Sequence, residues 1–139
     1  MKTIKYYIPM IALMGAALTF NACDREKDEE EEAPELMFKS GGSYTAADAT
    51  VSVGDVVTIG IEAEVHEEKD PLKKFNISKS VNGGALEDVY NEDLSSESFD
   101  YDFTVTIDST QKGNTEKYTF TVTNRDGLTG QKSLTLTVN

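Results

Sequence analysis

The sequence predicts an all-β domain over residues 36–139, an antiparallel β-sandwich of seven or eight strands. Apolar and polar residues alternate with a period of two in several segments, as in strands that bury one face. Turn residues separate these segments at short intervals, and no helical periodicity follows Phe20. A segment of this length suits one domain and is too short for two.

The strands expected in the first half of the domain differ in length. Residues 36–38 begin the alternating pattern, and residues 50–53 form a second short segment. Residues 57–65 alternate throughout, which predicts a long strand with one solvated face. Residues 75–81 continue the pattern, but Lys79 takes an inward position, which predicts a bulge or a sheet edge there.

The second half contains the clearest strand signal. Residues 82–84, Asn-Gly-Gly, favour a hairpin turn because these residues accept positive φ. The return strand at residues 86–90 has a weak pattern, and residues 91–98 are expected to form a loop. Residues 99–107 then alternate over nine positions. The last two strands are expected at residues 118–122 and 134–138.

Short strands at this spacing in about 100 residues are typical of an immunoglobulin-like sandwich, with a closed barrel as the main alternative. Residues 72–77 (LKKFNI) and 82–84 (NGG) resemble the middle hairpin of immunoglobulin-like domains on Bacteroidota surface lipoproteins. Residues 117–127 (KYTFTVTNRDG) and 133–138 (SLTLTV) are similar to the closing hairpin of bacterial immunoglobulin-like and PKD-like modules. The resemblance implies the fold and no particular activity.

Two hallmarks of antibody domains, the paired cysteines and the core tryptophan, are absent. Phe75 and its neighbours are expected to fill that space. Tyr118 is a candidate for the tyrosine corner, whose hydroxyl bonds to the backbone upstream, and simple core packing is the alternative.

Residues 1–22 have the order of a signal peptide. Lys2 and Lys5 precede an apolar run over residues 6–20, and small residues follow it. A membrane-spanning helix needs about 20 apolar residues, and this run is shorter. The pattern therefore favours a cleaved signal peptide over a membrane anchor.

The single cysteine, Cys23, ends the motif Leu-Thr-Phe-Asn-Ala-Cys, which resembles the bacterial lipobox. Asn21 departs from the strict form of the box, which prefers a smaller residue. The resemblance implies that Cys23 carries lipid and becomes the first residue of the mature chain. Each buried methylene adds about 0.8 kcal/mol of membrane affinity, so several acyl chains would form a firm anchor.

Residues 23–35 are acidic and are expected to form a disordered, flexible tether, because like charges repel and nothing in residues 24–32 can enter a core. An acidic stretch directly after the lipidated cysteine resembles the signal that exports Bacteroidota lipoproteins to the outer face of the outer membrane. The expected location is therefore the outer membrane, lipid-anchored and exposed at the cell surface. A periplasm-facing position is the alternative.

The charge balance excludes some partners. The chain carries 25 acids and 13 bases, a formal net charge of −12. Nucleic acid is not an expected partner, because its binding depends on Lys and Arg at phosphates. Acidity also disfavours docking of the folded surface on anionic lipid, so contact with the membrane is expected through the lipid anchor.

Catalytic and metal-binding signals are weak. The one histidine, His66, lies beside two glutamates and is expected to be an exposed loop residue, which leaves no base for a triad and too few ligands for zinc. Asp100 and Asp102 share one strand face, as do Glu62 and Glu64, and both pairs are expected to be solvated. A sandwich of this size leaves little room for a closed cleft. The prediction is therefore no enzyme, no cofactor and no metal site.

Three further possibilities remain open in the sequence. An oxygen-rich loop could bind Ca²⁺. Asp-Ser-Thr at residues 108–110 matches the pattern for protein O-glycosylation in the Bacteroidota, with Ser109 as the acceptor. Tyr44 and Tyr90 are candidates for exposed aromatic platforms that bind sugar. The acids of the calcium candidate are Glu87, Asp88, Glu92 and Asp93.

Two functions remain as hypotheses. In the first, the domain is a non-catalytic module that mediates interaction with an envelope protein, or adhesion, at the cell surface. In the second, it is an accessory glycan-binding lipoprotein of an outer-membrane polysaccharide-uptake system, resembling the immunoglobulin-like first domains of starch-binding lipoproteins.

Overall fold

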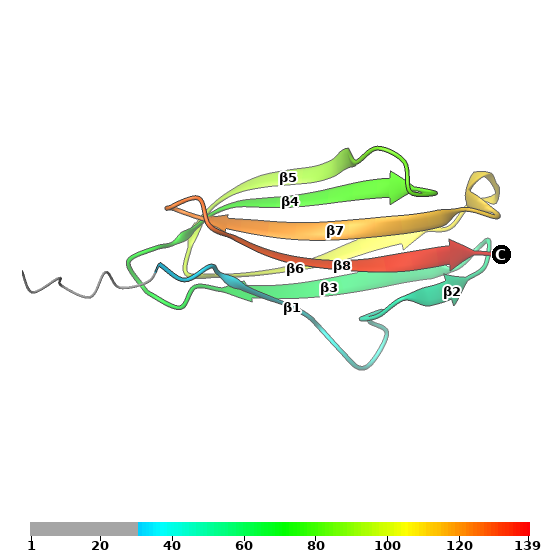
Figure 1. Cartoon of the computed structure of the whole chain (residues 1–139). Coiled ribbons are helices and arrows are strands. Elements are labelled where there is room, and N and C mark those ends of the chain that lie inside the picture. The colour runs from blue at the N-terminus through cyan, green and yellow to red at the C-terminus, as the bar shows by residue number, and fades with distance from the viewer. Residues whose placement is uncertain (1–30) are drawn as a thin grey trace, which may run out of the picture.

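The computed structural model describes residues 31–139, which form eight strands and one short 3₁₀ turn. The expected signal peptide, Cys23 and the first part of the expected tether lie outside the described residues. The all-β prediction is confirmed (Figure 1). The elements are β1 (Glu35–Phe38), β2 (Ala49–Val51), β3 (Val56–Glu64), β4 (Leu72–Val81), β5 (Glu87–Ser96), β6 (Ser98–Thr106), η1 (Ser109–Gln111), β7 (Thr115–Asn124) and β8 (Thr129–Val138).

The strands form two sheets packed face to face (Figure 1). Sheet A has three strands in the order β1-β3-β6, and sheet B has five in the order β2-β8-β7-β4-β5. The pairings between named strands of residues 31–139 are antiparallel except that of β2 with β8, which is parallel. The chain thus begins in sheet A, crosses to sheet B at β2, and builds an immunoglobulin-like sandwich.

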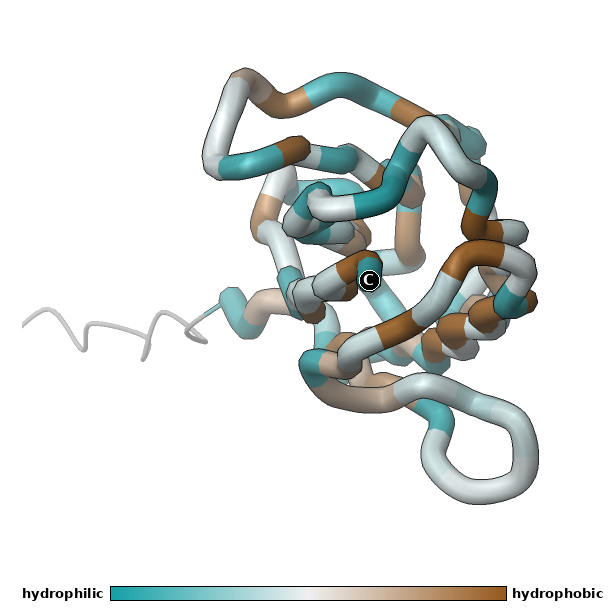
Figure 2. Tube along the Cα trace, turned by 90° about the vertical axis from the view of Figure 1, so that its right-hand side faces the viewer, coloured by the Kyte–Doolittle hydropathy of each residue, from teal (hydrophilic) through white to brown (hydrophobic). Residues whose placement is uncertain are grey.

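The core lies between the sheets and consists of the inward residues of each alternating pattern. Hydrophobic and hydrophilic residues alternate along the tube in Figure 2. Phe75 is fully buried and its ring lies 5.1 Å from that of Phe99 and 5.6 Å from that of Tyr101, between centroids. It therefore fills the centre of the core, as expected. The other side chains at 0 % exposure are Ile59, Ile61, Leu72, Ile77, Phe120, Val122 and Leu136.

The loop expected at residues 91–98 is instead strand, because β5 runs from Glu87 to Ser96. Its inward positions are Tyr90, Glu92 and Leu94, all partly buried. The acid at the middle position hides the period of two in the sequence. The structure tolerates it because the Tyr90 hydroxyl donates a hydrogen bond of 2.6 Å to Glu92 Oε2.

The irregularity expected near Lys79 is present, but the extra residue belongs to the neighbouring strand. Ile77 pairs with Tyr90 and the next residue of β4, Ser78, pairs with Asp88, so Val89 of β5 has no partner in the β4 register. Such a bulge bends an edge strand and interrupts its outer ladder of hydrogen-bonding groups. The free edge of β5 is therefore irregular.

The tyrosine-corner interpretation of Tyr118 is wrong, and core packing is right. Tyr118 is 2 % exposed, and its hydroxyl donates to Glu116 Oε2 at 2.8 Å instead of to the backbone. Within residues 31–139 no helix has the length and apolar character needed to cross a bilayer.

Candidate functional site

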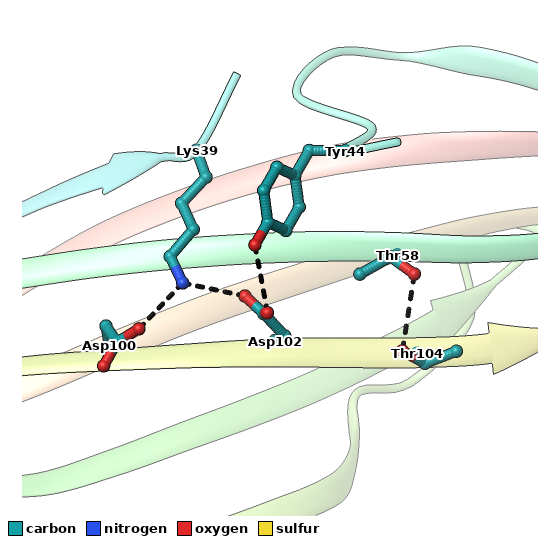
Figure 3. A network of polar contacts seen from close by, with 6 residues as sticks. All are labelled: Lys39, Tyr44, Thr58, Asp100, Asp102 and Thr104. Atoms are coloured by element: carbon teal, nitrogen blue, oxygen red, sulfur yellow. Dashed lines mark hydrogen bonds and ion pairs between the residues drawn. The ribbon is translucent and has the colours of Figure 1, made fainter. Parts of the chain in front are cut away.

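The outer face of sheet A carries a connected set of polar side chains, Lys39, Tyr44, Asp100 and Asp102, here called the Lys39 network (Figure 3). Lys39 follows β1, and its Nζ lies 2.8 Å from Asp100 Oδ2 and 2.8 Å from Asp102 Oδ1. The Tyr44 hydroxyl donates to the other oxygen of Asp102 at 3.0 Å. Asp102 is therefore held from two sides.

Gly60 of β3 allows this arrangement. A Cβ on this residue would lie 2.6 Å from Lys39 Cδ and 2.7 Å from Tyr44 Cε1, closer than such atoms approach. The backbone is also tied at this point, because the Lys39 N–H donates to the Gly60 carbonyl at 2.9 Å and the Thr45 N–H to that of Thr58 at 2.8 Å. The absence of a side chain on β3 thus lets the segment after β1 lie flat across the sheet.

The hydrogen bonds of the network shift the titration of its members. The Lys39 ammonium lowers the pKa of Asp102 below its ordinary value, mainly by its hydrogen bond. The Asp102 carboxylate raises the pKa of Tyr44 by accepting its hydroxyl proton, and burial adds to this. The bonds to Asp100 and then Asp102 raise the pKa of Lys39. At neutral pH the network is therefore a fixed pattern of charges on an exposed face.

Two shallow grooves flank the network and share Met37 and Glu62. The first, of about 310 Å³, continues over Phe99 and Asp100. The second, of about 550 Å³, includes Lys39 and Tyr44. Met37 is 43 % exposed, so the floor of the grooves offers apolar surface between carboxylates.

A second feature is the open side of the sandwich, where β5 ends sheet B and β6 ends sheet A. The Tyr90 ring of β5 stacks on the Tyr101 ring of β6, with centroids 4.7 Å apart at 28°. The hydrogen bond to Glu92, followed by burial, raises the pKa of Tyr90 above its ordinary value. The inward apolar residues here are only partly buried: Tyr90, Leu94, Phe99, Tyr101, Phe103 and Val105.

The structure changes the expectation for the paired carboxylates. Asp100 and Asp102 do share one face of β6. They are exposed to solvent, but each of them also binds Lys39. Glu62 and Glu64 of the adjacent β3 line the first groove. The four acids thus belong to one face of sheet A, which separate strand patterns did not indicate.

The candidate ligands of calcium lie on strand β5 and not in a loop. Asp88 accepts a hydrogen bond of 3.1 Å from Asn76 Nδ2, and Glu92 accepts from Tyr90. His66 lies in the connection after β3 with Nδ1 3.6 Å from Glu32 Oε2. In the described part of the chain, no three histidine, cysteine or acidic side chains gather as a metal site would require.

Ser109 is exposed and is the first residue of η1. Asp108 caps this turn by accepting the Thr110 N–H at 2.8 Å, and Gln111 Oε1 accepts the Asp108 N–H at 2.7 Å. Gln111 Nε2 also donates to the buried Glu116 at 3.0 Å. The candidate acceptor is therefore displayed on a turn anchored to the core.

Lys39 is the member of the network that sequence reasoning missed. It lies just past a short strand, far along the chain from its partners in β6. Tyr44 is part of the network and not an isolated ring, because its hydroxyl binds Asp102 and Lys39 Nζ lies 5.6 Å from its ring centroid. Gly60, in the middle of a strand pattern, is the one signal that indicates a close approach at this face.

No protein-family model matches the chain, and no curated protein matches it in sequence. Among solved structures it is similar to a superoxide reductase (neelaredoxin) from Ignicoccus hospitalis, with a TM-score of 0.52, 8% identity, and coverage of 80% of this chain and 83% of that one. A DUF4466 family protein from Parabacteroides merdae matches with a TM-score of 0.42, 12% identity, and coverage of 73% and 42%. The CARDB domain of a Pyrococcus furiosus protein, in complex with di-metal ions, matches with a TM-score of 0.43, 12% identity, and coverage of 76% and 94%. These likenesses concern the fold.

The first of these structures corrects the prediction that the chain is not an enzyme. That prediction used the small size of the sandwich as an argument against a catalytic cleft. The superoxide reductase shares the fold over most of its own length, so this size and this architecture are compatible with catalysis. At 8% identity the likeness gives this chain no reaction.

Proposed function

We propose that this chain is a lipid-anchored protein of the bacterial outer membrane whose immunoglobulin-like domain binds a partner protein at the cell surface. The order of residues 1–22, the lipobox-like motif ending at Cys23 and the acids that follow support the anchor and the address. The open side between β5 and β6 supports the binding role, and it is the observation on which the proposal depends.

The open side carries aromatic side chains of the kind that protein interfaces use. Tyr90 and Tyr101 are stacked at its centre, and the inward side chains around them are only partly buried. Aromatic side chains are enriched in interfaces because they combine large apolar area with a polar end. By contrast, the inward residues of the central strands β3 and β7 are almost fully buried. A partner would complete burial at the open side between β5 and β6.

Cross-linking on intact cells, followed by purification of the chain and mass spectrometry, tests this function. Surface or secretion proteins cross-linked to the chain are the expected result. The matched control is Cys23→Ser, which keeps the domain and is expected to lose both the anchor and the cross-links. Protease treatment of intact cells tests the address, because a surface-exposed domain is degraded and a periplasmic one is protected. Protection would contradict surface display.

Glycan binding within an uptake system is the second candidate function, and the groove beside the Lys39 network favours it. Tyr44 supplies an aromatic ring, and Lys39 and Glu62 supply hydrogen-bonding groups at the same groove. Titration of the purified chain with soluble polysaccharides, followed by NMR, tests it. Shifts confined to this groove and lost in Tyr44→Ala would support glycan binding, and their absence across neutral and acidic glycans would contradict it.

O-glycosylation at Ser109 is part of the same proposal. The serine is exposed on η1, where a modifying enzyme can reach it. The intact mass of the chain from its native host is expected to exceed the sequence mass, and Ser109→Ala is expected to remove the glycan contribution. A glycan mass that is the same in the original chain and in Ser109→Ala would contradict the assignment of Ser109 as the acceptor.

A further inference from the structure

The two sheets end in four edge strands, and they differ in how they are protected. β1 and β2 are short, with four and three residues. β5 is long, but its register is broken at Val89 and again near its end opposite Leu72. β6 has nine residues and pairs with β3 without any register shift. Short strands and bulges are the usual protection of sheet edges, so β6 is the long edge that lacks both.

The main-chain groups of β6 alternate between its partner and the free edge. At one end Val65 N–H donates to the Glu97 carbonyl, and at the other Ile107 N–H donates to that of Asp55. Odd-numbered residues of β6 therefore bond to β3, and even-numbered residues direct their N–H and C=O groups away from it. In the described part of the chain no strand pairs with that edge. The residues of β6 whose main-chain N–H and C=O groups point to the free edge are Ser98, Asp100, Asp102, Thr104 and Thr106.

The side chains beside this edge specify what could pair with it. On the inner face, the partly buried Phe99, Tyr101 and Phe103 would gain cover from apolar side chains of an added strand. On the outer face, Asp100 and Asp102 would become cross-strand neighbours of that strand. Residues 87–106, which span the neighbouring edge strands β5 and β6, contain seven acids and no lysine or arginine. An occupant with alternating apolar and basic residues fits both faces.

Charge argues against two other occupants. A second copy of the chain would bring a second set of the same acids to the edge, and like charges across strands are destabilising. Residues 24–32 of the chain itself are also predominantly acidic and would be repelled. Lys39 neutralises only part of the charge, because it binds two carboxylates. A basic segment from another protein is the occupant that the charges favour.

We propose that the free edge of β6 is a docking edge, where an extended basic segment of a partner protein pairs as an additional strand of sheet A. This inference rests on the proposed protein-binding function and names the chemistry of the partner. The main-chain bonds supply pairing, the inward positions of the partner cover the open side, and its outward Lys or Arg side chains approach Asp100 and Asp102.

A synthetic nine-residue peptide of alternating Lys and Val tests the edge with the full chain purified in detergent. We expect binding by calorimetry. The amides of Asp102 and Thr104 are expected to exchange rapidly in the free chain and to become protected by the peptide. The amides of Tyr101 and Phe103, already bonded to β3, are expected to be protected in both states. Absence of binding, or protection at another strand, overturns the proposal.

Two matched controls separate strand pairing from charge attraction. The same peptide N-methylated at alternate residues keeps its charge but loses the donors that face β6, and it is expected to bind at least about tenfold more weakly, a difference of about 1.4 kcal/mol. The alternating Glu-Val peptide is expected not to bind. Equal binding of the methylated peptide overturns the proposal, because attraction to the acids would then explain it.

Protein variants give the same test from the other side. Thr104→Pro removes an outward N–H and no bond to β3, a position where edge strands accept proline, and it is expected to lose peptide binding at least about tenfold. Thr104→Val keeps the N–H and is expected to bind as the original chain does. The two variants are compared after thermal melting shows that both fold. If Thr104→Pro does not fold, the N-methylated peptide provides the test of strand pairing.

The experiments distinguish an error in the docking edge from an error in the proposed protein-binding function. Cross-links to surface proteins that persist in Thr104→Pro would keep the protein-binding function and overturn the docking edge. Peptide binding in vitro without any cross-linked protein on cells would keep the docking edge and overturn the protein-binding function. Sedimentation of the chain alone is expected to show a monomer, and a dimer lost in Thr104→Pro would assign the edge to a second copy and overturn the proposal.

Discussion

Replacing Tyr118 with phenylalanine is expected to destabilise the domain by about 2 kcal/mol. Glu116 is 1 % exposed at the end of the core, and its Oε2 accepts hydrogen bonds from Tyr118 at 2.8 Å and from Gln111 at 3.0 Å. Tyr118→Phe removes one of these two donors and keeps the ring. A hydrogen bond accepted by a carboxylate contributes about 1.5–3 kcal/mol, and a buried oxygen that loses it has no water to replace the donor.

Thermal and urea denaturation measure this loss. For a domain of about 100 residues each kcal/mol corresponds to about 4–8 °C, so the melting temperature is expected to fall by about 10 °C. Glu116→Leu provides the control in a double-mutant cycle, because without the carboxylate the Tyr118 hydroxyl has lost its acceptor. Tyr118→Phe should then cost much less. The same cost with and without Glu116 would refute the reasoning and assign the effect to packing.

Three further predictions concern titration and the anchor. Burial, followed by the bond to Glu116, raises the pKa of Tyr118 above that of a tyrosine in the unfolded chain. The protonated Tyr118 hydroxyl therefore contributes fully to stability below about pH 10, and this contribution is lost as the pH rises above that value. Urea denaturation between pH 9 and pH 11 should therefore show a steeper loss for the original chain than for Tyr118→Phe, and equal slopes would contradict this. Asp102→Asn is expected to lower the pKa of Tyr44 toward its ordinary value, because it removes the carboxylate that holds the phenol proton; an unchanged NMR titration of Tyr44 would show that the bond is not formed in solution. Cys23→Ser is expected to abolish incorporation of labelled palmitate and to move the chain out of the membrane fraction, and label retained in this variant would place the lipid elsewhere.

The strands that sequence predicted well are those whose inward positions are uniformly apolar. β6 alternates throughout and β3 does so from Val57 on, and their observed bounds lie within one residue of the predicted ones. The sequence pattern ends β5 too early because Glu92 takes an inward position, where the pattern requires an apolar residue. A local pattern cannot show that Tyr90 supplies that acid with a hydrogen bond, since this depends on the fold.

Pairings between distant segments were the part that the sequence left undetermined. The parallel bridge of β2 with β8 joins the beginning of the domain to its end, and three residues of pattern carry no information about such a partner. The Lys39 network is similar, because Asp100 and Asp102 were visible as a pair but the cation came from beyond another strand. Charge and periodicity predicted the faces of the strands, and topology decided what lies opposite them.

The place of β1 at the edge of sheet A determines how the domain would carry mechanical load. β1 joins β3 through four residue pairs, from Glu35 with Glu64 to Phe38 with Ile61. A force applied at Glu35 along the strand runs perpendicular to these ladder bonds, so the four pairs are sheared together and do not open one after another. From β3 the load passes to β6 through a longer ladder within the same sheet. A pull between the proposed anchor and a partner at β6 would therefore load the β1–β3 ladder first, and loss of β1 would remove the buried Leu36 from the core and Phe38 from its contact with Phe120 of β7.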